Sequence, residues 1–197
     1  MTNGNDRAAS ALALLLTAIA VGAAEGQEVS RVTVLQFTPA AIEAWYVVND
    51  GVMGGISSSR MRPEAGDVAV FEGNLSLENN GGFASVRTEI AEGILAGAST
   101  LILTVRGDGK RYQLRLRMSQ GFDGVAYGAS FETTAGQWSE VELPLELFRP
   151  TFRGYVPRDA RPLDPARVRQ VGLMLTDKQE GPFRLEVAGL DAVRGSR

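Results

Sequence analysis

The 197-residue sequence contains neither cysteine nor histidine. Without cysteine there can be no disulfide, no thiol nucleophile and no thiolate ligand for a metal. Without histidine, imidazole ligation of zinc is excluded, together with the side chain that most often acts as a general acid or base. No catalytic motif of another kind is present, so we predict that the protein is not an enzyme.

An excess of positive charge is also missing, because 20 Lys and Arg residues stand against 23 Asp and Glu residues, a net charge of −3. Nucleic-acid-binding domains carry a basic patch or stripe, so we expect no nucleic-acid partner. The apolar stretch at residues 8–24 is broken by polar or small residues. It is short for a membrane-spanning helix, which needs roughly 20 apolar residues.

The first 24 residues have the layout of a secretory signal peptide. Arg7 precedes the apolar stretch, and Ala23 and Ala24 offer a cleavage site. We therefore predict a signal peptide at residues 1–24, a single mature domain at 25–197 with no membrane span, and a bacterial periplasmic or secreted location. An uncleaved amino-terminal anchor is the alternative.

Short apolar runs separated by turn residues make up the rest of the chain, without sustained helical periodicity. In residues 83–90, Ala84 and Val86 alternate with Ser85 and Arg87, which places them on opposite faces of a strand. Similar runs are 29–37, 68–71, 75–77, 101–105, 112–118, 168–175 and 183–187, and a hairpin-like pair at 129–133 and 138–143 surrounds Ala135-Gly136. This series predicts an all-β sandwich or barrel.

Two polar runs stand out, at residues 45–57 and 73–87. The first joins Asn49 and Asp50 to a pair of glycines, and the second does the same with Asn79 and Asn80. These residue types allow positive φ and hold tight turns. The runs are either well-made turns of a β domain or rigid polar loops that present a binding surface.

The sequences Asn-Asp-Gly-Val-Met-Gly-Gly at 49–55 and Asn-Asn-Gly-Gly-Phe-Ala-Ser-Val-Arg at 79–87 resemble those of the complex I intermediate-associated protein family. The likeness continues through Arg-Gly-Asp-Gly-Lys-Arg-Tyr at 106–112 and Gly-Pro-Phe-Arg-Leu at 181–185. It implies a jelly-roll β-sandwich similar to galactose-binding domains and some carbohydrate-binding modules. It also implies binding or assembly and not catalysis, since the mitochondrial member helps assemble respiratory NADH:ubiquinone oxidoreductase.

On this basis we predict a non-catalytic binding or assembly module that engages a protein partner in the cell envelope. A lectin-like carbohydrate-binding module is the alternative. Four arginines on predicted strands could gather on one sheet face to bind carboxylate, phosphate or sugar hydroxyls. Alternatively, they form cross-strand ion pairs with Glu89, Glu132, Glu140 and Glu142. The four are Arg87, Arg106, Arg115 and Arg117.

Trp45 and Trp138, the two tryptophans, either stack on a sugar ring or pack in the core. Acidic residues in glycine-bearing loops could hold a structural calcium, although turn capping explains them equally well, and no other cofactor is expected. The candidate binding residues are Trp45, Asn49, Asp50, Asn79, Asn80, Arg87, Arg106, Asp108, Tyr112, Arg115 and Trp138.

Overall fold

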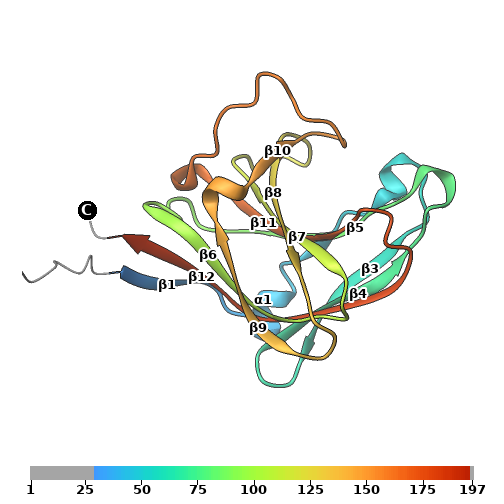
Figure 1. Cartoon of the computed structure of the whole chain (residues 1–197), viewed down its shortest axis with the longest axis horizontal. Coiled ribbons are helices and arrows are strands. Elements are labelled where there is room, and N and C mark those ends of the chain that lie inside the picture. Colours follow the sequence, from blue (N-terminus) through green and yellow to red (C-terminus); the bar gives the residue numbers. More distant parts are fainter. Residues whose placement is uncertain (1–28, 196–197) are drawn as a thin grey trace, which may run out of the picture.

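The computed structural model describes residues 29–195, so the predicted signal peptide at 1–24 lies outside the described residues. Two antiparallel sheets stack against each other (Figure 1). The predicted all-β sandwich is confirmed. Among the described residues, no helix has the length and apolar character needed to cross a membrane.

One sheet, here called sheet A, has the strand order β3-β4-β12-β6-β9, and β1 pairs with the far end of the long β12. The pairing of β12 with β6 shifts register between Val187 and Gly189, a β-bulge that bends the long strand. The strands are β1 (Val29–Leu35), β3 (Ser58–Glu64), β4 (Val68–Leu75), β6 (Ala98–Arg106), β9 (Trp138–Pro144) and β12 (Gly181–Gly195).

The other sheet, sheet B, has the order β10-β8-β7-β11-β5-β2. Its strands are β2 (Tyr46–Val47), β5 (Ala84–Glu89), β7 (Arg111–Arg117), β8 (Ala126–Glu132), β10 (Arg149–Thr151) and β11 (Gln170–Leu175). Short helical turns join the strands: α1 (Pro39–Ile42), η1 (Asp50–Met53), η2 (Glu78–Asn80), η3 (Leu145–Leu147) and η4 (Pro165–Arg167).

The core lies between the sheets, where alternate side chains of each strand point inward. Phe71 and Leu185 of sheet A and Leu114 of sheet B are fully buried. On β5, the buried residues Ala84 and Val86 face this core, as the alternation predicts. The outer faces therefore carry the polar residues of each strand, and the sites described below lie on those faces and in the loops.

Two details of the predicted strand arrangement are wrong. β8 and β9 do not form a hairpin: β8 pairs with β7 in sheet B, and β9 pairs with β6 in sheet A. The connection crosses between the sheets, where Ala135 bridges to Gly107. β3 was not predicted, because this edge strand carries arginine, glutamate and proline and has no regular apolar alternation.

Candidate functional site

The two polar runs meet at the side chain of Asp50, which is fully buried. Its carboxylate accepts hydrogen bonds from the backbone N–H of Ser57 (3.0 Å), Gly82 (2.8 Å) and Phe83 (3.3 Å), and from the Ser57 hydroxyl. Burial by itself would raise the pKa of Asp50, but these hydrogen bonds outweigh it and hold the pKa below its ordinary value. One ionised side chain thus fastens the loop around η1 to the loop around η2.

Asn49 makes a second fastening beside Asp50. Its Oδ1 accepts from the Ser85 backbone N–H (3.0 Å) and the Ser59 hydroxyl (2.7 Å), and its Nδ2 donates to the Ser57 carbonyl (3.3 Å). Asn49 and Asp50 are therefore internal clamps and do not present a polar surface.

Asn79 and Asn80 differ from this pair, because both are exposed. Their backbones are left-handed, with φ of 54° and 62°. Asparagine tolerates this conformation better than most residues, which accounts for the pair at this turn.

In each glycine pair, one glycine adopts a positive φ and the other packs too closely against Asp50 to carry a side chain. Gly54 (φ 92°) and Gly82 (φ 138°) supply backbone conformations that other residues rarely adopt. A Cβ on Gly55 would lie 2.4 Å from the Asp50 Cγ, and one on Gly81 would lie 2.8 Å from Asp50 Oδ2. The inner glycines are thus required because the backbone packs directly against the buried carboxylate.

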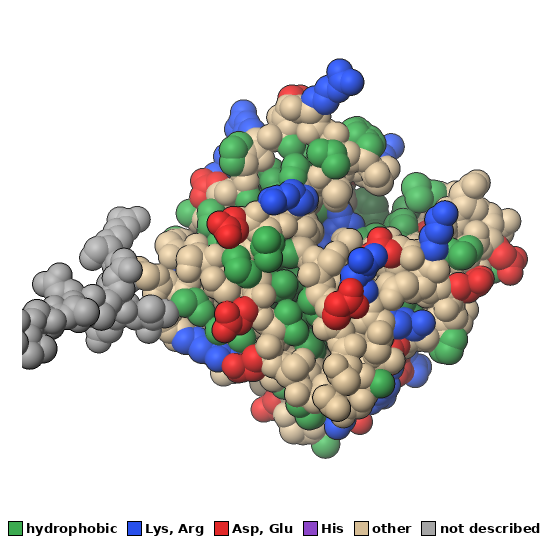
Figure 2. All heavy atoms as spheres, in the orientation of Figure 1, with side chains coloured by type: hydrophobic (Ala, Val, Ile, Leu, Met, Phe, Trp, Pro, Cys, Tyr) green, Lys and Arg blue, Asp and Glu red, His purple; other side chains and the backbone are tan. Residues whose placement is uncertain are grey.

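The clamped loops carry large apolar side chains in water. Val52 is 62 % exposed, Ile56 55 %, Met53 54 % and Leu77 38 %. We call these four residues the loop tips. The loops around η1 and η2 form the lobe at the right of Figure 1, and Figure 2 shows hydrophobic side chains on the surface of that lobe. Sequence reasoning missed them, although four large apolar residues inside two polar turn sequences were a signal.

Three of the four candidate arginines gather on the outer face of sheet B. Arg87 and Arg115 pair with Gly172 from opposite sides, and Arg117 lies two residues beyond Arg115 on the same face. None of the three forms an ion pair with an acidic side chain among residues 29–195. Neither alternative describes all four arginines, because Arg106 lies in sheet A and pairs with Glu186.

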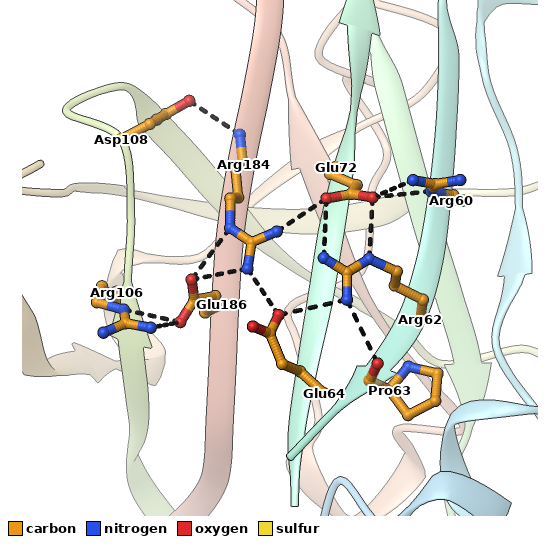
Figure 3. Close-up of polar contacts among 9 residues, drawn as sticks. All are labelled: Arg60, Arg62, Pro63, Glu64, Glu72, Arg106, Asp108, Arg184 and Glu186. Carbon is orange, nitrogen blue, oxygen red and sulfur yellow. Dashed lines mark hydrogen bonds and ion pairs between the residues drawn. The ribbon is translucent and has the colours of Figure 1, made fainter. Parts of the chain in front are cut away.

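Sheet A carries its arginines in an alternating ladder of ion pairs (Figure 3). Glu72 contacts both Arg62 (3.0 Å) and Arg184 (2.9 Å), and Arg184 also contacts Glu64 (2.6 Å). Hydrogen bonding from Arg62 is the main cause that lowers the pKa of Glu72 to about 2. The glutamates of the ladder neutralise these arginines of sheet A, in contrast to Arg87, Arg115 and Arg117 on sheet B.

Two hollows lie on the outer side of sheet A. One of about 490 Å³ is lined by Ser58, Ser59, Arg60, Glu72, Gly73 and Phe183, and one of about 350 Å³ by Arg106, Gly107, Asp108, Gly136, Arg184 and Glu186. The arginines and glutamates that line them already pair within the ladder, and Asp108 accepts hydrogen bonds from neighbouring groups of the fold.

Asp108 and Tyr112 form another internal clamp. Asp108 accepts hydrogen bonds from the Tyr112 hydroxyl (2.9 Å) and from the backbone N–H of Lys110 (3.1 Å) and Arg184 (2.9 Å). Tyr112 is fully buried, so its contribution to this clamp is internal to the fold. Burial, and then the charge of Asp108, raise the pKa of the Tyr112 hydroxyl.

The two tryptophans differ in exposure. Trp45 is half-buried and packs on Phe37, with 5.9 Å between ring centroids, whereas Trp138 is 43 % exposed beneath the guanidinium of Arg106. Asp50 and Asp108, two acidic residues considered for a structural calcium site, lie in separate clamps. Within residues 29–195, no group of three or more acidic side chains is placed to hold a metal ion.

The strand arrangement defines a fold class: a jelly-roll β-sandwich with a galactose-binding-like fold. A family 11 carbohydrate-binding module from Clostridium thermocellum, solved with a β-1,3-1,4-mixed-linked tetrasaccharide, has a TM-score of 0.63 at 14 % identity, covering 84 % of this chain and 96 % of that one. A family 29 carbohydrate-binding module has a TM-score of 0.51 at 8 % identity, covering 86 % and 91 %. These likenesses establish the fold.

Within this class, the chain belongs to the complex I intermediate-associated protein 30 (CIA30) family, whose pattern it matches over residues 35–187. The mouse mitochondrial protein of that name is 27 % identical over 74 % of this chain and 51 % of its own length. The Drosophila melanogaster protein is 25 % identical over 76 % and 58 %. The chain spans about half the length of the curated relatives it matches.

These relatives correct one prediction. The proteins of mouse, Caenorhabditis elegans and Drosophila melanogaster are all named as mitochondrial. The predicted bacterial periplasmic or secreted location is therefore wrong. The prediction depended on the apolar stretch at residues 8–24, and hydropathy alone does not define a protein's destination.

Proposed function

We propose that this chain is a non-catalytic assembly module whose loop tips bind a protein partner, an intermediate of respiratory complex I. The names of its relatives support association with such intermediates. Two carboxylates that could have served chemistry, Asp50 and Asp108, are committed to hydrogen bonds within the fold. This supports recognition as the function in place of bond cleavage.

The observation that carries the proposal is the combination of a buried clamp with exposed apolar side chains. A buried carboxylate is unfavourable unless its hydrogen bonds compensate, and here those hydrogen bonds fix two loops to each other. Leaving Val52, Met53 and Ile56 in water forgoes roughly 25 cal/mol for each Å² of apolar surface not buried. Such a patch, held rigid, is typical of a docking site that loses little entropy on binding.

The test is a pull-down from detergent-solubilised membranes with the full chain carrying Val52→Ser, Met53→Ser and Ile56→Ser together. We expect recovery of complex I subunits to fall at least about tenfold, because buried apolar anchors dominate interface energies. Leu147→Ser, at an equally exposed apolar residue (49 %) on η3, is the control and should bind normally. Unchanged recovery by a folded triple variant would refute the proposal.

Glycan binding is a second candidate, and the exposure of Trp138 favours it. The Arg106 guanidinium lies 5.1 Å from the Trp138 ring centroid, at the rim of the smaller hollow of sheet A. A sugar would have to use the ring face that Arg106 leaves open. A glycan array that compares the wild type with Trp138→Ala tests this candidate function. Glycan binding is refuted if no saccharide binds the wild type and loses that binding in Trp138→Ala.

A further inference from the structure

Arg87 and Arg115 lie in one row across the outer face of sheet B with a glycine between them, and Arg117 lies in the neighbouring row of the same face. Strand pairing sets Tyr46 opposite Arg87, Arg87 opposite Gly172, Gly172 opposite Arg115, and Arg115 opposite Gly128. A Cβ on Gly172 would lie 2.9 Å from the Val86 carbonyl oxygen and 3.1 Å from the Arg87 Cβ, whereas one on Gly128 would lie nearest to Gln113 Oε1, at 3.1 Å. Gly172 thus leaves space beside the Arg87 side chain.

Arg87 is held in one orientation. Its guanidinium carbon lies 5.1 Å from the Tyr46 ring centroid and 4.8 Å from that of Phe122, and its Nη2 donates to the Phe122 carbonyl (2.9 Å). Only 5 % of Arg87 is exposed. Cation–π contacts on both sides fix the charge in place without neutralising it.

The guanidinium groups of Arg115 and Arg117 donate hydrogen bonds only to neutral groups among the described residues. Arg115 donates to the Met174 sulfur and the Thr151 hydroxyl (2.8 Å), and Arg117 donates to the Gly124 carbonyl (2.8 Å). Burial, and then the charges of Arg117 and Arg87, lower the pKa of Arg115 to about 10, so the group remains protonated at neutral pH. The three positive charges therefore repel one another.

Two acidic side chains lie nearby, and neither forms an ion pair with the three arginines. Glu89 lies on the same face, two strands from Arg117, and accepts a hydrogen bond from Gln120 (3.4 Å). Asp123 pairs with Arg153 at 2.5 Å. In the part of the chain that the structure describes, the buried Nε–H groups of Arg87 and Arg115 have no hydrogen-bond acceptor.

A buried charge without a partner is costly, and on sheet A the arginines of the ladder, Arg62, Arg106 and Arg184, all pair with glutamates. Guanidinium groups present forked donors that match the oxygens of a carboxylate or a phosphate. We propose that Arg87, Arg115 and Arg117 form an oxyanion site that takes one carboxylate or phosphate group. The group belongs either to a small molecule or to an acidic side chain of a bound protein.

The experiment titrates the full chain with inorganic phosphate and with acetate while sodium chloride holds the ionic strength constant. We expect a saturable rise in Tm, about 3–5 °C at ten times the dissociation constant for a chain of this size. The ¹⁵N–¹H signals of the buried Arg87 and Arg115 Nε groups should shift in step with it. Absence of both responses would overturn the proposal.

Arg115→Met and Arg87→Met should abolish the response. Because each removes one of three repelling charges, we expect Arg115→Met to keep or raise the Tm measured without phosphate. Arg60→Met, on the ion-paired ladder of sheet A, is the control and should respond as the wild type does. If a methionine variant does not fold, Arg115→Lys keeps the charge, loses the fork, and should bind at least about threefold more weakly.

A response that survives in Arg115→Met would overturn the proposal. A dissociation constant for phosphate or glycerol phosphate below about 1 mM, a range typical of small-ligand sites, would identify a small molecule as the source. Weak binding of free anions, together with loss of the protein partner in Arg115→Met, would identify an acidic side chain. The loop-tip variant should keep its phosphate response, so failure of the proposed function and failure of this inference are distinguishable.

Discussion

Substitution of Asp50 by asparagine tests the central clamp, because it changes one oxygen and little of the shape. An amide keeps one acceptor oxygen, so either the Ser57 N–H or the Gly82 and Phe83 N–H groups lose their acceptor. An unsatisfied buried donor costs about 1–3 kcal/mol, and the remaining bonds lose their charge assistance. We therefore expect Asp50→Asn to lower the free energy of unfolding at pH 7 by about 2–4 kcal/mol.

The pH dependence gives this prediction a second, independent readout. The folded-state pKa of Asp50 is below its ordinary value, so its contribution to stability is present above the unfolded pKa of about 3.9 and is lost as pH falls through the folded pKa. At lower pH the protonated carboxyl resembles the amide. The difference in stability between wild type and Asp50→Asn should therefore shrink between pH 5 and pH 2, values spanning about the carboxyl range.

Urea denaturation followed by tryptophan fluorescence measures both quantities. Asp159→Asn, at an exposed residue, is the matched control and should change stability by less than about 0.5 kcal/mol. The reasoning is refuted if Asp50→Asn is as stable as the control at pH 7. It is equally refuted if its destabilisation is the same at every pH.

Three further substitutions test other parts of the fold. Gly55→Ala should destabilise the fold by more than about 2 kcal/mol, because its Cβ would overlap Asp50. Gly51→Ala, where a Cβ would have nothing within 4 Å, is the control and should be neutral. Equal melting temperatures of the two variants in thermal denaturation would contradict this prediction. Glu72→Gln should lower stability at pH 7 and flatten its decline between pH 4.5 and about 2, and an acid titration with the wild-type slope would exclude this. Tyr112→Phe should cost about 1–3 kcal/mol in urea, since its hydroxyl donates to a buried carboxylate, and a neutral result would remove that role.

The strand content was predictable because alternation has a local cause. On β5 and β7, apolar residues recur at every second position, and those positions are buried in the core. Edge strand β3 and the separation of β8 from β9 were not predictable. An edge strand needs little apolar surface, and which sheet a strand joins depends on contacts distant in sequence.

The candidate site shows the same division. The two polar runs and their glycines were recognisable, but which side chains they bury was not: Asp50 is buried, Asn49 is hydrogen-bonded within the fold, and Val52 and Met53 are exposed. No sequence pattern distinguishes an aspartate that caps a turn from one that holds two loops together. That distinction arises because Gly82, which is 32 positions away from Asp50, donates to its carboxylate.

By itself, the sequence determined that this protein is a β-sandwich of the complex I intermediate-associated family without cysteine or histidine chemistry. Both conclusions depend on residue types and local order, which folding does not alter. Only the tertiary structure decided which charges are neutralised. Arg106 and Arg115 look alike in the sequence, yet one lies in sheet A against Glu186 and the other lies in sheet B without an acidic partner among the described residues. Coulomb energy depends on distance in space, and strand pairing sets that distance.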